Sequence, residues 1–395
     1  MSFSTLGLHP SLLETLASLG YVEPTPVQRA AIPAALSGTD LLVSSQTGSG
    51  KTAAFMLPAL ERLRAPRGGA GARVLVLAPT RELALQVQKA THGYGRGQRL
   101  RTACLVGGMP YGPQLKALDK PVDVVIATPG RLKDHLERGG LQLAQVEILV
   151  LDEADRMLDM GFQEDIDSIV ARTPATRQTL LFSATLEGVV GRLARRVTRE
   201  PKRIDVAPSK TRAAAIEQHA LFADNFAHKT RLLDVLLRDA ELKQALVFTA
   251  TKRSAENLSG SLVRQGFAAG ALHGDMRQRE RNATLQHLRD GRMRVLVATD
   301  VAARGIDVPG ISHVINFDAP RQAEDYVHRI GRTGRAGRSG VAVTLLAHDE
   351  RYLMRSIERY TGAALTVSVI PGHEPAARAA PASPGRRRYS ARAAR

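Results

Sequence analysis

The sequence predicts an α/β protein built from two tandem domains, each with its own parallel β-sheet. The chain has 395 residues, more than one ordinary hydrophobic core supports, so two domains are expected. Short apolar runs rich in Val, Ile and Leu recur along it, and each ends in a polar residue or Gly. This pattern is typical of strands buried on both faces of a sheet. Amphipathic segments separate the runs and are expected to form crossover helices.

The expected strands fall into two groups with a break between them. The first group is DLLVSS, RVLVLAPT, DVVIATPG, EILVLDEAD and TLLFSAT, and the second is ALVFTAT, RVLVATD and HVINFD. Pro, Ser and charged residues interrupt the pattern near residue 208. We expect an N-terminal domain over 1–207, a short linker over 208–217 and a C-terminal domain over 218–370. Residues 371–395 are rich in Pro, Ala and Arg and are expected to form a basic, disordered tail.

The charge of the chain points to a polyanionic partner. The formal net charge is +17, from 55 Lys and Arg against 38 Asp and Glu, which favours nucleic acid first and an acidic membrane second. No apolar stretch reaches the roughly 18 residues needed to span a bilayer, and the N-terminus lacks a signal-peptide pattern. We therefore expect a cytoplasmic protein with no membrane partner. Cys104 is the only cysteine, which excludes an intrachain disulfide and a multi-cysteine metal site.

The segment SSQTGSGKT follows the first expected strand and has the features of a phosphate-binding loop. It matches the pattern G-x-x-x-x-G-K-[ST], with Ser45 in place of the first Gly. Gly48 and Gly50 let backbone N–H groups turn toward phosphate oxygens at the positive end of the next helix. Lys51 would reach the β- and γ-phosphates, and the Thr52 hydroxyl would bind Mg²⁺. A turn that binds nothing is the alternative, but such a turn has no use for the Lys-Thr pair.

An acidic pair ends another expected strand, EILVLDEAD. Asp152 stands where the buried strand ends and can hold Mg²⁺ directly or through water. Glu153 follows as the candidate base that orients the attacking water. Alone, this pair would equally fit a solvated acidic turn, because strands commonly end in Asp. Its combination with Lys51 favours a nucleotide site.

Arginines at a spacing of three mark the segment YVHRIGRTGRAGR in the C-terminal half. They are Arg329, Arg332, Arg335 and Arg338. An arginine inserted at a γ-phosphate contributes roughly 10³ to 10⁵ in rate. Alternatively, each arginine neutralises a phosphate of a nucleic acid. Both uses are compatible if different residues serve them.

Eight motifs in a fixed order together resemble one family. They are PTPVQ, SQTGSGKT, PTRELALQ, TPGR, DEAD, SAT, ATDVAARGIDV and HRIGRTGR. By these motifs the chain resembles the DEAD-box ATP-dependent RNA helicases of superfamily 2 over about residues 1–370. DEADRMLDMGF and ALHGDMRQRERNATL resemble the bacterial RhlE type. The resemblance implies RecA-like domains, ATP and Mg²⁺ as cofactors, RNA as partner, and RNA-dependent ATP hydrolysis.

The resemblance also implies the ATP-binding and catalytic residues. Gln28 would bind the adenine edge, because a side-chain amide offers one donor and one acceptor and so rejects guanine. Phe3 would stack on the adenine, or else be a flexible N-terminal aromatic. Asp307 would contact the ribose, and Arg332 and Arg335 would be the arginine fingers. The catalytic set is Lys51, Asp152, Glu153, Arg332 and Arg335. The ATP-binding set is Phe3, Gln28, Gln46, Thr47, Gly48, Ser49, Gly50, Lys51, Thr52, Gly305 and Asp307.

Coupling and RNA-binding residues follow from the same resemblance. Ser183 and Thr185 would meet His328 and link hydrolysis to domain closure; a packed core histidine is the alternative for His328. The RNA set of the first domain is Pro79, Thr80, Arg81, Gly107, Gly108, Thr128, Pro129, Gly130 and Arg131. That of the second is Gly274, Asp275, Gln278, Arg281 and Thr299. Such groups position a strand without reading its sequence, and a chain with 4% aromatic residues and no Trp offers little base stacking.

The expected mechanism is a two-state clamp. ATP and RNA each contact both domains, so each favours closure and thereby the binding of the other. Beyond RNA itself, the expected partners are ribosomal precursors or, alternatively, RNA-decay machinery. The alternatives are a DNA translocase of the same superfamily and an ATP-gated RNA scaffold or annealer with little unwinding. The Arg-rich tail would add non-specific RNA affinity or act only as a solubilising end.

Overall fold

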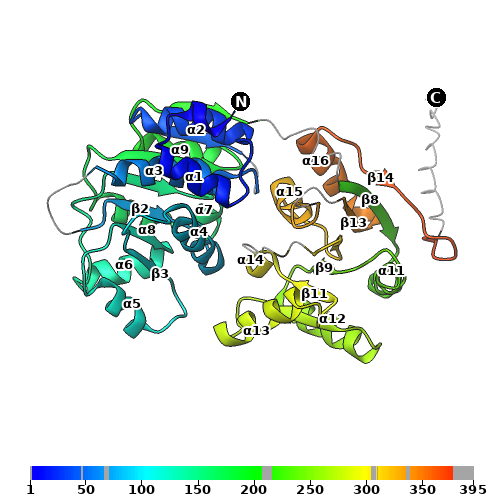
Figure 1. The fold of residues 1–395 in the computed structure, drawn as a ribbon. Helices are drawn as coiled ribbons and strands as arrows, with labels where there is room; N and C mark the ends of the chain where they lie inside the picture. Colours follow the sequence, from blue (N-terminus) through cyan, green and yellow to red (C-terminus); the bar gives the residue numbers. More distant parts are fainter. Residues whose placement is uncertain are drawn as a thin grey trace, which may run out of the picture.

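The computed structural model contains two seven-stranded sheets, and every pair of neighbouring strands is parallel. Figure 1 shows the first sheet with its helices in blue to green, and the second in green to orange. The predicted α/β fold with two parallel-sheet domains is therefore confirmed. The structure describes residues 2–45, 48–65, 71–206, 216–303, 308, 310–334 and 339–376.

The strands include all eight segments that the sequence predicts. The first sheet holds β1 (Leu41–Ser44), β2 (Val74–Leu77), β3 (Thr102–Leu105), β4 (Val124–Ala127), β5 (Ile148–Leu151), β6 (Gln178–Ser183) and β7 (Lys202–Asp205). The second holds β8 (Ile216–Ala223), β9 (Ala245–Phe248), β10 (Ala269–Leu272), β11 (Val295–Ala298), β12 (His313–Asn316), β13 (Gly340–Ala347) and β14 (Thr366–Val367). The apolar pattern misses β3, β7, β8, β10, β13 and β14.

The two sheets share one topology, although the sequence shows no repeat. The strand order is β3-β4-β2-β5-β6-β1-β7 in the first and β10-β11-β9-β12-β13-β8-β14 in the second. Each strand of the second sheet thus occupies the place of the strand seven positions earlier in the chain. Ligands of such open parallel sheets bind beyond the carboxyl ends of the strands, where the predicted motifs lie.

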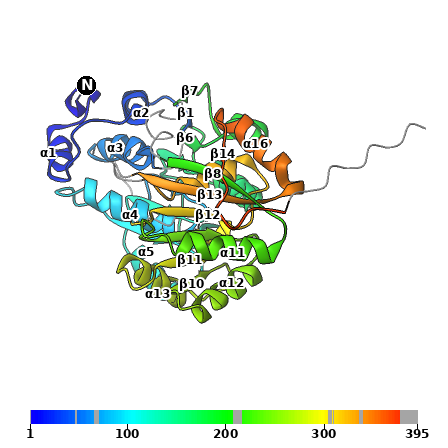
Figure 2. The same cartoon turned by 90° about the vertical axis from the view of Figure 1, so that its right-hand side faces the viewer.

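Helices cover both faces of each sheet (Figures 1 and 2). The first domain has a 3-10 helix η1 (Phe3–Leu6) and helices α1 (Pro10–Ser18), α2 (Pro26–Leu36), α3 (Lys51–Leu63), α4 (Arg81–Tyr94), α5 (Tyr111–Leu118), α6 (Pro129–Glu137), α7 (Ala154–Asp159), α8 (Gln163–Val170) and α9 (Gly188–Val197). The second has α11 (Phe226–Leu237), α12 (Lys252–Arg264), α13 (Gln278–Arg289), α14 (Asp300–Ala303), α15 (Ala323–Ile330), η2 (His348–Glu350) and α16 (Arg351–Thr361).

Successive side chains of a strand point to opposite faces of the sheet, so the core of the first domain has two layers. Val74 and Val76 of β2 pack into one hydrophobic cluster, and Leu75 and Leu77 pack into another on the opposite face. All four side chains are fully buried. Because both faces of the sheet are covered, its strands must be apolar at every position, which is the pattern that made them predictable.

Two expected boundaries need correction. β8 begins at Ile216 and pairs with β13, so the second sheet starts within the expected linker over 208–217; residues 207–215 lie outside the described residues. Residues 371–376, expected to begin a disordered tail, contact the second domain: the Ala376 N–H donates to Asp224 at 3.0 Å. Residues 377–395 lie outside the described residues. In the described part of the chain, no helix is both long and apolar enough to cross a bilayer.

Candidate ATP and RNA sites between the domains

The phosphate-binding loop joins β1 to α3 at the carboxyl edge of the first sheet. β1 ends at Ser44 and α3 begins at Lys51. Gly50 precedes the helix with a φ of 94°, a left-handed conformation that favours glycine. A side chain at this position would collide with the Gln28 amide. The turn therefore presents the free N–H groups of a helix N-terminus at a place suited to phosphate.

Two polar side chains at this loop are bound within the first domain. Lys51 is 7% exposed, and its Nζ donates to the Ser45 carbonyl at 3.1 Å. Gln28 donates through Nε2 to the Gly50 carbonyl at 3.1 Å, and its Oε1 accepts from the Thr25 N–H at 2.9 Å. The oxygen and the nitrogen of the Gln28 amide thus each make one hydrogen bond, and each can make one more. To reach the phosphates of a nucleotide, Lys51 would have to leave the Ser45 carbonyl.

Asp152 directly follows β5 and is 2% exposed. Burial raises the pKa of its carboxyl group, while the nearby Lys51 ammonium acts in the opposite direction. Its Oδ1 atom has no hydrogen-bond partner within the described part of the chain. Mg²⁺ prefers oxygen ligands such as carboxylates. A buried carboxylate oxygen near Lys51, next to which Thr52 supplies a hydroxyl, fits this ion.

Glu153 begins α7 with an unusual backbone and a buried ion pair. Its φ is 53°, a left-handed conformation that costs a non-glycine residue of order 1–3 kcal/mol. Its Oε2 accepts a hydrogen bond from Nη1 of Arg156 at 2.9 Å, and the two side chains are 7% and 2% exposed. None of the predicted site residues is Arg156. Its signal in the sequence is its position three residues after Glu153, on the same face of a short helix.

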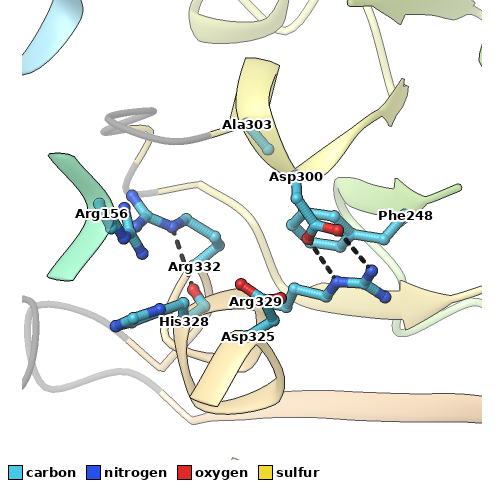
Figure 3. A pocket seen from close by; sticks show the side chains of 8 residues that line it. All are labelled: Arg156, Phe248, Asp300, Ala303, Asp325, His328, Arg329 and Arg332. Atoms are coloured by element: carbon cyan, nitrogen blue, oxygen red, sulfur yellow. Dashed lines mark hydrogen bonds and ion pairs between the residues drawn. The ribbon is translucent and has the colours of Figure 1, made fainter. Parts of the chain in front are cut away.

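The second domain meets α7 through α15 and the residues just after it. Figure 3 shows the pocket that Arg156 lines together with Arg332 and His328. Arg332 is 5% exposed, and its Nε donates to the His328 carbonyl at 3.3 Å. Arg329 instead forms two hydrogen bonds with the Asp300 carboxylate, at 2.6 and 2.7 Å. The charge of Arg329 is therefore compensated inside the second domain.

Two of the three predicted coupling residues, Thr185 and His328, line a second pocket between the domains. Thr185 and Asp155 line it from the first domain, and His328 lines it from the second. Ser183 is fully buried, and its Oγ accepts from the Thr185 N–H at 3.3 Å. Asp155 accepts from the Ala184 N–H at 2.9 Å, which ties the SAT segment to the acidic motif. His328 lines both pockets, the one that holds Arg156 and Arg332 and the one that holds Asp155 and Thr185.

Predicted RNA contacts from the two domains line one cleft of about 330 Å³. From the predicted set these are Pro79, Thr80, Arg81, Gly107, Thr128, Gly130, Arg131, Gly274 and Arg281. Four further lining residues are absent from the predicted set, namely Glu82, Met160, Phe162 and Val301. Two of them, Met160 and Phe162, lie in the segment DMGF that follows the acidic motif. Their apolar side chains in an otherwise polar stretch were the feature of the sequence that could have indicated them.

Two contacts cross this cleft and join the domains. Arg81 donates to the Gln278 side chain at 2.6 Å. Arg281 donates to the Glu82 carboxylate at 3.1 and 3.2 Å and also to two backbone carbonyls of its own domain. Arg281 is 6% exposed and links the two domains; its role as an RNA contact stays a prediction. Burial lowers the pKa of Arg81, and the neighbouring Arg281 and Arg131 add to this effect.

The remaining predicted RNA residues lie around the cleft with different surroundings. The Arg81 guanidinium lies over Gly108, which leaves no room for a side chain there. Pro129 is the first residue of α6, and Thr299 is partly buried beside α14. Asp275 is 62% exposed and forms an ion pair with Lys252. This pairing lowers the pKa of the Asp275 carboxyl group, so the residue is a carboxylate at neutral pH and is suited to hydroxyls rather than phosphates.

Phe3 does not lie as expected. It is 4% exposed and belongs to the hydrophobic core of the first domain, edge-on to Tyr21 with ring centroids 6.0 Å apart. Phe3 is therefore not a flexible terminal aromatic. Its ring also has no exposed face on which adenine could stack, because other apolar side chains cover it. Other predicted residues, Gln46, Thr47, Gly305, Asp307 and Arg335, lie outside the described residues.

Comparisons with known proteins identify the family. The family model "DEAD/DEAH box helicase" matches residues 25–193, and "Helicase conserved C-terminal domain" matches residues 228–337. The chain is 45% identical to the DEAD-box ATP-dependent RNA helicase CshA of Bacillus cereus over 363 residues, which are 91% of this chain and 68% of that protein. It is 44% identical to the ATP-dependent RNA helicase SrmB of Escherichia coli, over 96% of this chain and 86% of that one.

Solved structures give the same result. Dbp5 of S. cerevisiae, bound to RNA and ADP BeF3, superposes with a TM-score of 0.83 and 32% identity, over 93% of this chain and 95% of that one. The chain therefore belongs to the DEAD-box family of ATP-dependent RNA helicases, and the predicted family is confirmed. The RhlE-type subgroup stays a prediction.

Proposed function

We propose that this protein clamps single-stranded RNA between its two domains and uses ATP hydrolysis to open the clamp, separating short duplexes. The observation that carries the proposal is the division of the machinery: the phosphate loop, Asp152 and Glu153 belong to the first domain, and Arg332 and His328 come from the second. Neither domain alone holds a complete site. Hydrolysis therefore requires closure, and RNA that spans both domains favours closure.

Each residue has one role in this proposal. Lys51 binds the β- and γ-phosphates of ATP, and Arg332 stabilises charge on the transferred phosphoryl group together with the predicted Arg335. Glu153 orients the attacking water and accepts its proton. Thr52 and Asp152 would hold Mg²⁺, which supplies charge neutralisation at the phosphates when bound. His328, Thr185 and Ser183 would transmit closure between the sites.

The RNA-binding groups favour a sequence-tolerant partner. The described members of the predicted set are mostly backbone N–H groups, hydroxyls and guanidinium groups, which suit phosphate and sugar oxygens. We propose a cytoplasmic protein, with either ribosomal precursors or RNA-decay machinery as its partners. Single-stranded RNA of any sequence would then serve in the first assay.

Steady-state ATPase assays without polynucleotide, with single-stranded RNA, and with DNA of the same sequence test this function. We expect stimulation by RNA, little by DNA, and loss of the stimulated rate in Glu153→Gln. Equal stimulation by DNA would favour a translocase. Absence of turnover under every condition, with RNA binding intact, would favour an ATP-gated scaffold.

A further inference from the structure

Arg156 belongs to the first domain but lies in a pocket formed mainly by the second. The pocket is lined by Phe248, Ala303, His328 and Arg332 of the second domain, among others (Figure 3). Arg156 is 2% exposed there. A guanidinium group is costly to bury unless it is well paired, so this placement calls for a reason.

The hydrogen-bond partner of its guanidinium is the carboxylate of Glu153. Nη1 of Arg156 donates to Oε2 of Glu153 at 2.9 Å within the first domain. A charge-assisted hydrogen bond of this kind is stronger and more directional than a neutral one. Glu153 also has a left-handed backbone at a φ of 53°. Both the main chain and the side chain of the predicted base are therefore held in one defined position.

The second domain restricts the other side of the same guanidinium. Nε of Arg156 has no hydrogen-bond partner in the described part of the chain, although the second domain lines the pocket with charged residues as well as with Phe248 and Ala303. Two carboxylates, Asp300 and Asp325, line the pocket, and Asp300 already accepts two hydrogen bonds from Arg329. Arg156 is therefore packed by the second domain but bonded to Glu153 in the first.

We propose that Arg156 is a positioning residue that fixes the Glu153 carboxylate when the second domain closes over it. The inference rests on the proposed function, in which Glu153 orients the attacking water. While the domains are apart, the wall that packs against Arg156 is missing, and the Arg156 to Glu153 pair is open to solvent. Closure buries the pair and removes its freedom to move, so the base reaches its working position only in the closed state.

Arg156→Met tests this role by keeping an apolar stem and removing the guanidinium. At saturating RNA we expect kcat for ATP hydrolysis to fall about 10- to 100-fold, since misplacing a catalytic group by about 1 Å has that effect. KM for ATP and RNA affinity with a non-hydrolysable ATP analogue should stay within about 3-fold, because those depend on other contacts. Arg156→Lys should recover part of kcat, since it restores the charge without the planar fork.

A double-mutant cycle separates positioning from a merely structural role. If Arg156 acts through Glu153, adding Arg156→Met to Glu153→Gln should lower the residual rate less than about 2-fold. The double variant also leaves no unpaired buried charge, so it guards against misfolding. Arg238→Gln, which breaks an exposed ion pair with Asp234 on α11, is the matched control and should leave every constant unchanged.

Three results would overturn the proposal: an unchanged kcat in Arg156→Met, an equal fractional loss on the Glu153→Gln background, or a loss of RNA affinity as large as the loss of kcat. A wild-type chain with no RNA-stimulated turnover would instead contradict the proposed function itself, and this inference with it. The wild-type measurement therefore comes first and distinguishes the two failures.

Discussion

The two halves of the interdomain cleft differ in where their polar groups find partners. On the nucleotide side the bonds stay inside one domain: Lys51 binds the Ser45 carbonyl and Gln28 binds the Gly50 carbonyl. On the RNA side the bonds cross between domains, from Arg281 to Glu82 and from Arg81 to Gln278. The bonds on the nucleotide side therefore hold the phosphate loop in place, and those on the RNA side hold the two domains together.

This difference indicates what each ligand must displace. ATP competes with the contact between Lys51 and the Ser45 carbonyl, so its binding is a local exchange within the first domain. RNA enters a cleft in which the domains already touch, so its binding is linked to the distance between them. Changes on the nucleotide side should alter kcat or the KM for ATP, and changes on the RNA side should alter how strongly ATP and RNA favour each other.

The largest expected effect lies on the nucleotide side, at Arg332. Arg332→Gln should lower kcat about 10³-fold or more, because an arginine at the transferred phosphoryl group contributes that much. KM for ATP should change little, since the first domain supplies the ground-state contacts. Steady-state ATPase at saturating RNA measures both constants. A loss smaller than about 10-fold would place Arg332 away from the reacting phosphate.

Gln28→Ala is expected to raise the KM for ATP by about 10- to 100-fold, because it deletes hydrogen bonds worth about 1–3 kcal/mol. The KM for GTP should rise less, so the preference for ATP should shrink. Parallel titrations with ATP and GTP give the ratio. Full retention of that preference would show that Gln28 holds Gly50 without contacting the base.

Glu82→Gln sharpens the comparison on the RNA side. It weakens the ion pair with Arg281, so RNA affinity with a non-hydrolysable ATP analogue should fall about 10-fold, the equivalent of about 1.4 kcal/mol. Without nucleotide, affinity should change less than about 2-fold, because the domains are then free to separate. Fluorescence anisotropy of labelled RNA measures both.

Asp234→Asn serves as the control for Glu82→Gln, since it breaks a carboxylate to arginine pair that stays within the second domain. It should leave RNA affinity unchanged with or without nucleotide. Equal loss of RNA affinity in Glu82→Gln under both conditions would mean that Glu82 organises the first domain alone.

The smallest expected effect concerns residues 377–395, which carry six arginines. Their deletion should reduce the steepness with which RNA affinity falls with salt, because each neutralised phosphate contributes about 0.7 to the slope for single strands. ATPase constants at saturating RNA should not change. Titration at several salt concentrations gives the slope, and an identical slope would leave the tail with no role in RNA binding.

The sequence predicts well where the chemistry is local. The phosphate loop and Asp152 each follow a short apolar strand, and parallel strands place their carboxyl ends at one edge. Periodicity does not reveal β10 (Ala269–Leu272), whose residues AGAL contain Gly and are less completely buried than those of its neighbours. Its pairing with β11 is a tertiary contact, so no local pattern encodes it.

Predictions failed or were incomplete where a partner lies far along the chain. The role of Arg281 depends on Glu82, which is 199 positions away. Phe3 has its place because the apolar core of the first domain covers it, and its aromatic character alone does not reveal this. The proposed role of Arg156 depends on the second-domain residues that line its pocket, such as Arg332, which lies 176 positions further along the chain. The roles of these residues depend on contacts between distant parts of the chain, and a single sequence does not show which distant residues are in contact.

If ATP and RNA favour each other's binding through domain closure, one equilibrium measurement shows it directly. The Kd of wild-type protein for single-stranded RNA is determined without nucleotide and with a saturating non-hydrolysable ATP analogue. The account predicts tighter RNA binding with the analogue by about 5- to 150-fold, and the same factor for analogue binding when RNA is saturating. Equal RNA affinity under the two conditions would contradict it.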